Sequence, residues 1–191
     1  MATKADLTSF SHTDKELSSI IGDLKNIDIE SSYYLLLMIG RYKSGKKSFM
    51  SRVKKEIGEF EEINLAEYVD YNEEKTFQKI DKLFSYIGET EKNILFRNGD
   101  FLSGEYTGFS YSSQKYATPQ GKYLLKKIKA SEKFIIIDTE DPANVDKTME
   151  RYAQLGVRFD EADSLFGKII WRLKQIRLQG HTFSAKRTTA A

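Results

Sequence analysis

Apolar residues occur along the chain in two patterns, short unbroken runs and longer stretches with helical spacing. The unbroken runs at 33–39 ("YYLLLMI") and 133–138 ("KFIIID") have the length of fully buried strands. Shorter runs predict further strands around 61–65, at 93–96 and at 157–159. Apolar residues recur every three or four positions in segments that predict helices: 14–31, 46–57, 72–89, 122–130, 145–156 and 160–178.

Strands that alternate with helices predict an α/β fold, with a three-layer parallel β-sheet flanked by helices. We expect one α/β domain over residues 15–178, because 191 residues form a single core of ordinary size. Residues 1–14 are polar and are expected to be a flexible N-terminus. Residues 179–191 are expected to be a basic, flexible tail.

Composition excludes several classes of site. The chain has no cysteine, which excludes disulfides, thiolate metal sites and a cysteine nucleophile. The two histidines, His12 and His181, lie near opposite ends, so no metal site is expected. The apolar runs are too short to cross a membrane, and residues 1–17 lack the apolar core of a signal peptide. A cytoplasmic protein without membrane partners is therefore expected.

A near match to a phosphate-binding loop follows the strand at 33–39. Gly40, Gly45 and Lys46 have the spacing of that loop, but Lys47 stands where the magnesium-binding hydroxyl belongs. Backbone amides after a strand and the next helix N-terminus would hold the phosphate. The candidate residues for contact with a nucleotide phosphate are Gly40, Ser44, Gly45, Lys46, Lys47 and Ser48. The alternative is a basic turn between a strand and a helix, and these residues alone leave both interpretations open.

Longer segments resemble the core of AAA+ ATPases. "YIGETEKN" (86–93) and "FDEADSLFGK" (159–168) are similar to two motifs of that family, but Asp160 lies 114 residues after Lys46, too far for the family's order. In a second register, "ILFRNGDFLSG" (94–104) takes the place of the Walker B segment. "QKYATPQGKYLLKKI" and "FIIIDTEDPANVD" then resemble the next helix and the sensor strand. The resemblance covers roughly residues 30–175.

The resemblance implies a degenerate P-loop, AAA+-like core that has lost its chemistry. The positions of the Walker B acids fall on Asn98 and Gly99, and the sensor position falls on Glu140. Asn98 is a poor ligand for Mg²⁺, and Gly99 has no side chain to orient water. Arg151 falls near the arginine-finger position. No catalytic residue, no metal ligand and no cofactor other than weakly held ATP or ADP are therefore expected.

The leading hypothesis is a catalytically inactive structural, assembly or adaptor subunit. It would bind protein partners as a homo- or hetero-oligomer, and the resemblance connects it with phage-tail-like contractile particles. Three alternatives stay open. One is a nucleotide-binding switch at Lys46. Another is an active ATPase whose acids are Asp138 or Asp160 and Glu161. The third is a nucleic-acid-binding module that uses the basic tail.

Overall fold

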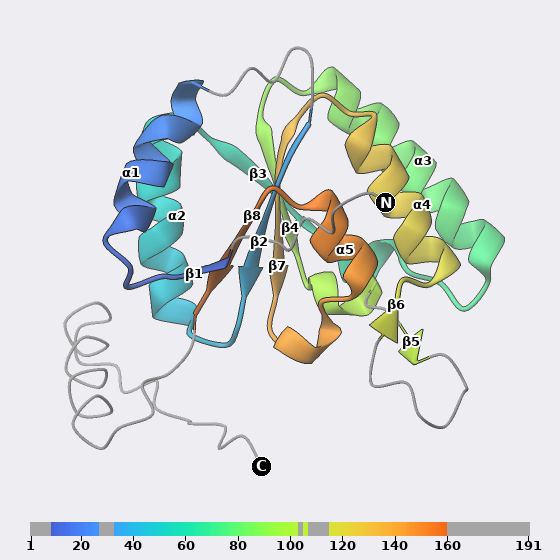
Figure 1. Ribbon diagram of the computed structural model, residues 1–191. Coiled ribbons are helices and arrows are strands. Elements are labelled where there is room, and N and C mark those ends of the chain that lie inside the picture. Colours follow the sequence, from blue (N-terminus) through green and yellow to red (C-terminus); the bar gives the residue numbers. More distant parts are fainter. Residues whose placement is uncertain (1–8, 27–32, 103–104, 107–114, 160–191) are drawn as a thin grey trace, which may run out of the picture.

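A six-stranded, all-parallel sheet forms the centre of the molecule (Figure 1). The computed structural model describes residues 9–26, 33–102, 105–106 and 115–159. The strands of the sheet follow the order β1-β8-β2-β7-β4-β3, so β2 lies between β8 and β7. The predicted three-layer α/β fold with a parallel sheet is confirmed.

The six strands are β1 (Ser9–Ser11), β2 (Tyr34–Ile39), β3 (Phe60–Asn64), β4 (Asn93–Arg97), β7 (Phe134–Thr139) and β8 (Leu155–Arg158). A separate antiparallel pair consists of β5 (Glu105–Tyr106) and β6 (Lys115–Tyr116). The helices are α1 (Glu16–Asp23), α2 (Lys43–Ile57), α3 (Glu73–Glu89), α4 (Pro119–Lys129) and α5 (Lys147–Tyr152). Short 3₁₀ turns are η1 (Leu24–Asn26), η2 (Leu65–Tyr68), η3 (Gly99–Leu102) and η4 (Pro142–Asn144).

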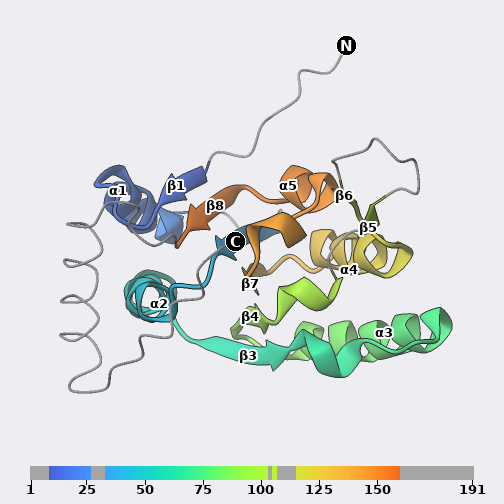
Figure 2. The same ribbon diagram turned by 90° about the horizontal axis from the view of Figure 1, so that it is seen from below.

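The sheet divides the core into two apolar layers (Figure 2). Helices α1 and α2 cover one face, and α3, α4 and α5 cover the other (Figure 1). Successive strand residues point to opposite faces, so Leu36 and Met38 pack with α1 and α2, whereas Leu35 and Leu37 pack with the other layer. Continuous apolar runs are needed because both faces are buried.

Several helix and strand boundaries differ from the sequence-based expectations. Helix α2 begins at Lys43 rather than at residue 46. Ser9–Ser11 pairs with β8, so the sheet extends into the segment expected to be flexible. The helix expected over 145–156 ends at Tyr152, because β8 takes up the chain from Leu155. The predicted helix at 160–178 and the tail at 179–191 lie outside the described residues.

Candidate functional site

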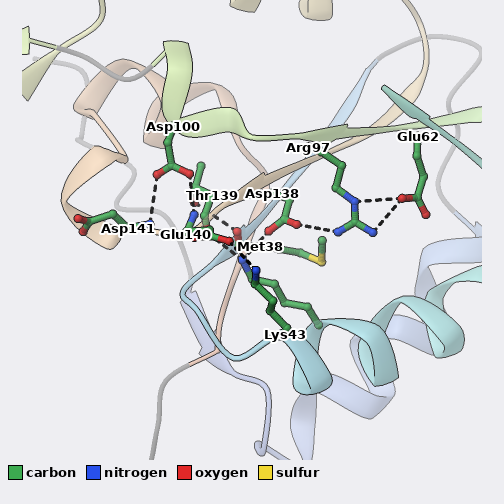
Figure 3. Close-up of polar contacts among 10 residues, drawn as sticks. Met38, Lys43, Glu62, Arg97, Asp100, Asp138, Thr139, Glu140 and Asp141 are labelled. Atoms are coloured by element: carbon green, nitrogen blue, oxygen red, sulfur yellow. Dashed lines mark hydrogen bonds and ion pairs between the residues drawn. The ribbon is translucent and has the colours of Figure 1, made fainter. Parts of the chain in front are cut away.

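Charged side chains gather where three neighbouring strands end. Phe60, Leu95 and Ile136 pack on the α2 face of β3, β4 and β7. The residue two positions later on each strand faces the same way, because side chains alternate along a strand. These residues are Glu62, Arg97 and Asp138. Parallel strands end at one edge of the sheet, so the three charges lie together beside the first turns of α2 (Figure 3).

Lys46 reaches this cluster from the first turns of α2. Its ammonium lies 2.5 Å from Oδ1 of Asp138 and donates a hydrogen bond to the Thr139 carbonyl at 2.8 Å. The lysine is 5% exposed, so its charge is withdrawn from solvent. Burial of a charge costs free energy unless it is paired, and Asp138 provides the pairing.

Arg97 joins Asp138 to Glu62. Its Nη1 donates to Oδ2 of Asp138 at 2.7 Å, while Nε and Nη2 donate to Oε2 of Glu62 at 3.1 and 3.0 Å (Figure 3). Partial burial alone would lower the pKa of Arg97, but the hydrogen bonds to Asp138 and Glu62 outweigh it and raise the pKa. Lys46, Asp138, Arg97 and Glu62 therefore form one connected charge network.

Asp100 positions the segment that follows β7. Its carboxylate accepts hydrogen bonds from the backbone N–H of Glu140 (2.8 Å) and of Asp141 (3.1 Å). It also accepts one from the Asn144 side chain at 2.9 Å. Figure 3 shows Asp100 above this turn, pointing toward Glu140 and Asp141. The 3₁₀ turn after β4 is thus tied to the chain after β7.

A cavity of about 690 Å³ opens beside this network, between α2 and the ends of β4 and β3. A stripe of α2 supplies one wall, and Glu62, Arg97 and Asn98 lie opposite. The residues that line it are Gly40, Lys43, Lys46, Lys47, Met50, Ser51, Lys54, Glu62, Arg97, Asn98, Asp138 and Glu140. In the described part of the chain, no group of three or more histidine, cysteine, aspartate or glutamate side chains could hold a metal ion.

The turn between β2 and α2 is shorter than a phosphate loop. Only three residues, 40–42, separate the two elements, and Gly45 and Lys46 already belong to the helix. Gly40 has φ +121°, and a Cβ there would lie 2.6 Å from the carbonyl oxygen of Phe159. A Cβ on Gly45 would lie 2.4 Å from the ring of Tyr42. Both glycines are thus explained by close packing within the protein.

Asn98 and Gly99 also have structural roles. Asn98 adopts φ 57°, a left-handed conformation that asparagine tolerates, and its amide donates to the Asn64 side chain at 2.7 Å. A Cβ on Gly99 would lie 2.4 Å from Cγ2 of Ile137, so η3 and β7 approach each other too closely there for a larger residue. Strand β7, and not β4, lies between β2 and the rest of the sheet on this side, which makes Asp138 the partner of Lys46.

The other candidate residues differ in their exposure, and two of them lie outside the described residues. Lys47 and Ser48 are exposed on α2, whereas Ser44 is buried, and its hydroxyl has no hydrogen-bond partner among the described residues. Glu140 pairs with Lys43 at 3.4 Å on the surface. Arg151 is exposed at the end of α5. Asp160 and Glu161 lie outside the described residues. Contact of the loop residues with a nucleotide phosphate stays a prediction.

Sequence reasoning missed Arg97 and Glu62 altogether and treated Asp138 only as an alternative acid. The sequence nevertheless contains a pattern that Arg97, Glu62 and Asp138 share. Each is a charged residue two positions after an apolar residue; Arg97 and Asp138 stand at the ends of predicted strands, and Glu62 stands near the start of one. Period-two alternation would have placed them on one face, but the order of the strands was needed to make them neighbours.

Comparisons with known proteins show the fold of this chain but do not assign the chain to a family. No family model matches the chain, and no curated protein matches it. A chain of the solved structure described as "Structure of E. coli MS115-1 HORMA:CdnC:Trip13 complex" is similar, with a TM-score of 0.56 and 14% identity. The alignment covers 86% of this protein and 65% of that chain. At this identity the similarity shows the fold alone.

The predicted membership of the AAA+ ATPases is corrected on these findings. The comparison with solved structures gives a chain of a HORMA:CdnC:Trip13 complex as one neighbour, which supports the α/β fold, and no family model matches. The geometry is compatible with the correction, because only three residues separate β2 from α2 and Lys46 is paired with Asp138. Among the described helices, none has the length and apolar character needed to cross a membrane.

Proposed function

We propose that this protein is a non-catalytic subunit that assembles with protein partners as a structural or adaptor component of a larger complex. The observation that carries the proposal is the pairing of Lys46 with Asp138. A phosphate-binding lysine must offer its charge to a ligand. Here the ammonium is buried, and the carboxylate of Asp138 neutralises its charge.

The similar solved structure gives independent support. It is described as a complex of HORMA, CdnC and Trip13, so a chain with a comparable fold occurs within an assembly of proteins. Fold similarity does not transfer a partner, so the proposal takes only the assembly role from this comparison. The link with contractile particles depended on the AAA+ resemblance and is not part of the proposal.

A nucleotide-binding switch is the second candidate, because the cavity lies beside the N-terminal turn of α2 and is lined by Gly40, Lys43 and Lys47. Phosphate binding would require Lys46 to exchange Asp138 for the ligand. The backbone N–H groups at the start of a helix favour anions, which gives this alternative a physical basis.

Calorimetric titration with ATP and ADP, with and without Mg²⁺, separates the two candidates. For an adaptor we expect no saturable binding below about 1 mM and no ATP turnover. Micromolar, Mg²⁺-dependent binding that is lost in Lys46→Met would contradict the proposal and establish the switch. Turnover that is abolished by Asp138→Asn would establish an ATPase instead.

Lys55→Met is a matched control for Lys46→Met, because Lys55 is an exposed lysine of the same helix that does not line the cavity. Thermal unfolding of each variant shows whether it is folded before the titration is interpreted. Loss of binding in both variants would point to a general charge effect, and that binding would not count as a specific nucleotide site.

A further inference from the structure

The cavity beside α2 continues along the helix as a basic groove. Lys43, Lys47, Met50, Ser51 and Lys54 recur every three or four residues and line one wall. That spacing places them on a single stripe of the helix. From Lys43 to Lys54 the stripe is roughly 16 Å long at 1.5 Å per residue.

The acidic side chains of the groove are already paired. Asp138 contacts Lys46 and Arg97, Glu62 contacts Arg97, and Glu140 contacts Lys43. The lining holds five cationic side chains and three carboxylates, so two positive charges remain in excess.

The excess positive charge lies on α2. Lys47 is exposed and has no ion pair with any residue in the described part of the chain. Lys54 pairs at 3.3 Å with Glu59, which is 73% exposed and free to move away in solvent. The unneutralised charge is therefore distributed along the helix, whereas the charges at the deep end of the groove neutralise one another.

We propose that this groove is a docking site for an acidic, extended peptide segment of a protein partner. The charge distribution carries the inference. An extended chain advances about 3.3 Å per residue, so about five residues would cover the lysine stripe. Alternate carboxylates would face the lysines, and Met50 offers an apolar contact near the middle of the wall. This inference rests on the proposed adaptor function, and it names the chemistry of the partner.

Other anionic occupants fit the groove less well. A compact phosphate group would need charge concentrated at one point, but Lys46 at the deep end is neutralised by Asp138. A nucleic-acid strand carries a negative charge at every nucleotide, so it would also place phosphates beside the carboxylates of the groove, whose cations are already paired. A peptide can place its carboxylates only where the lysines are.

The test uses the full chain and a fluorescein-labelled peptide of about eight residues in which glutamate alternates with leucine. A peptide with glutamine in place of glutamate is the control ligand. In low salt we expect a dissociation constant of about 10–100 µM for the acidic peptide, and weaker binding as salt screens the charges. Amide shifts in a ¹⁵N spectrum are expected at Lys47, Ser51 and Arg97, and not along α3.

The double variant K47E/K54E reverses the charges of the two lysines that are least neutralised by ion pairs with described residues. We expect it to weaken peptide binding by about tenfold or more, because like charges would then face each other. K55E is the matched control. Lys55 is exposed on the same helix but does not line the groove, so we expect a change of less than about twofold.

Three results would overturn the inference: equal weakening in K55E and K47E/K54E, equal affinity for the glutamine peptide, or no binding below about 1 mM. Tighter binding of ATP or of single-stranded DNA, lost in K47E/K54E, would reassign the groove to that ligand. Failure with the peptide leaves the adaptor proposal intact as long as the nucleotide titration stays negative. A positive nucleotide titration contradicts the adaptor proposal by itself.

Discussion

Lys46 and Asp138 meet across the gap between α2 and β7, with the ammonium 2.5 Å from Oδ1. Their side chains are 6% and 13% exposed, so neither charge has much access to water. Arg97 holds the second oxygen of Asp138. Asp138 therefore pairs with two cations, Lys46 and Arg97. Loss of Asp138 and loss of Lys46 should for this reason have different effects on stability.

Removal of Asp138 should cost more stability than removal of Lys46. Asp138→Ala leaves a buried ammonium unpaired, and we expect a loss of about 3–5 kcal/mol in the free energy of unfolding. Lys46→Met keeps the methylene contacts and leaves Asp138 bonded to Arg97, so a loss of about 1–2 kcal/mol is expected. Urea unfolding followed by circular dichroism measures both.

The double variant K46M/D138A completes a thermodynamic cycle. Its loss should be smaller than the sum of the two single losses by about 1–3 kcal/mol, because the second substitution removes a charge that the first left unpaired. If the losses in the free energy of unfolding were additive, Lys46 and Asp138 would not be energetically coupled, despite their short contact.

Substitution of Gly99 tests whether η3 must approach β7 closely. A Cβ there would lie 2.4 Å from Cγ2 of Ile137, a side chain inside the core. We expect Gly99→Ala to destabilise the protein by about 1–3 kcal/mol, as in other overpacked cores. Gly88→Ala is the matched control, since Gly88 is an exposed glycine of α3, and a Cβ there would have no atom within 4 Å. It should stabilise the helix by about 0.5–1 kcal/mol.

Chemical denaturation of the two glycine variants gives opposite signs if this explanation of Gly99 holds. A neutral or stabilising Gly99→Ala would mean that η3 moves away from Ile137 at little cost. The glycine would then need another explanation.

Asp100 should govern the order of the turn after β7. Asp100→Ala removes the acceptor of the Glu140 and Asp141 N–H groups, so faster amide hydrogen exchange is expected at those two residues. Exchange in α3 should stay unchanged. Asp23→Ala, at an exposed aspartate of α1, is the control variant and should leave residues 140–144 as protected as in the parent. Unchanged exchange in Asp100→Ala would show that the turn is held by other contacts.

Acid pH should loosen the contact between α3 and α4. Lys127 and Tyr123 of α4 both donate hydrogen bonds to Asp81 of α3, and these lower the pKa of Asp81, the Lys127 contact most. A carboxylate with a lowered folded-state pKa stabilises the protein above its unfolded pKa of about 3.9, and that contribution is lost as pH falls through the folded value. Asp81→Asn should therefore flatten the stability profile between about pH 5 and pH 2.

The same cluster should respond in the opposite direction at alkaline pH. Hydrogen bonding to Asp81 raises the pKa of Lys127, so its contribution is complete below its unfolded pKa of about 10.4 and disappears as pH rises through the folded value. Unfolding midpoints across both pH ranges, compared for the parent and Asp81→Asn, provide the measurement. Parallel profiles in both ranges would exclude the cluster as a source of the pH dependence.

The fold was predictable because its strands are buried on both faces. The unbroken apolar runs in β2 and β7 indicate buried strands, and the spacing in α3 defines its inner face. The start of α2 was placed three residues late, because the expected phosphate loop was assumed to stay open through Gly45. The tight packing of Gly40 against Phe159 closes that turn, and it depends on residues more than a hundred positions apart.

The candidate site was harder to predict because it depends on which strands are neighbours. Lys46 was identified from its spacing to the glycines, but its partner was sought after the strand at 93–96. The structure places β7 between β2 and β4, so Asp138 meets the lysine first. Period-two alternation assigns each charge to a face, whereas strand order is set by long-range packing that a local pattern does not encode.

Strand β8 has a consequence for how the protein is made. It pairs with both β1 and β2, although it is the last of the described strands in chain order. During synthesis β2 therefore lacks one of its neighbours in the sheet, and β1 lacks the strand it pairs with, until Arg158 has left the ribosome. A nascent chain cut short before that point presents the unpaired edge of β2, a template for pairing with another chain. The sheet therefore closes only after β8 has emerged, and the β2 edge is vulnerable to misassembly until then.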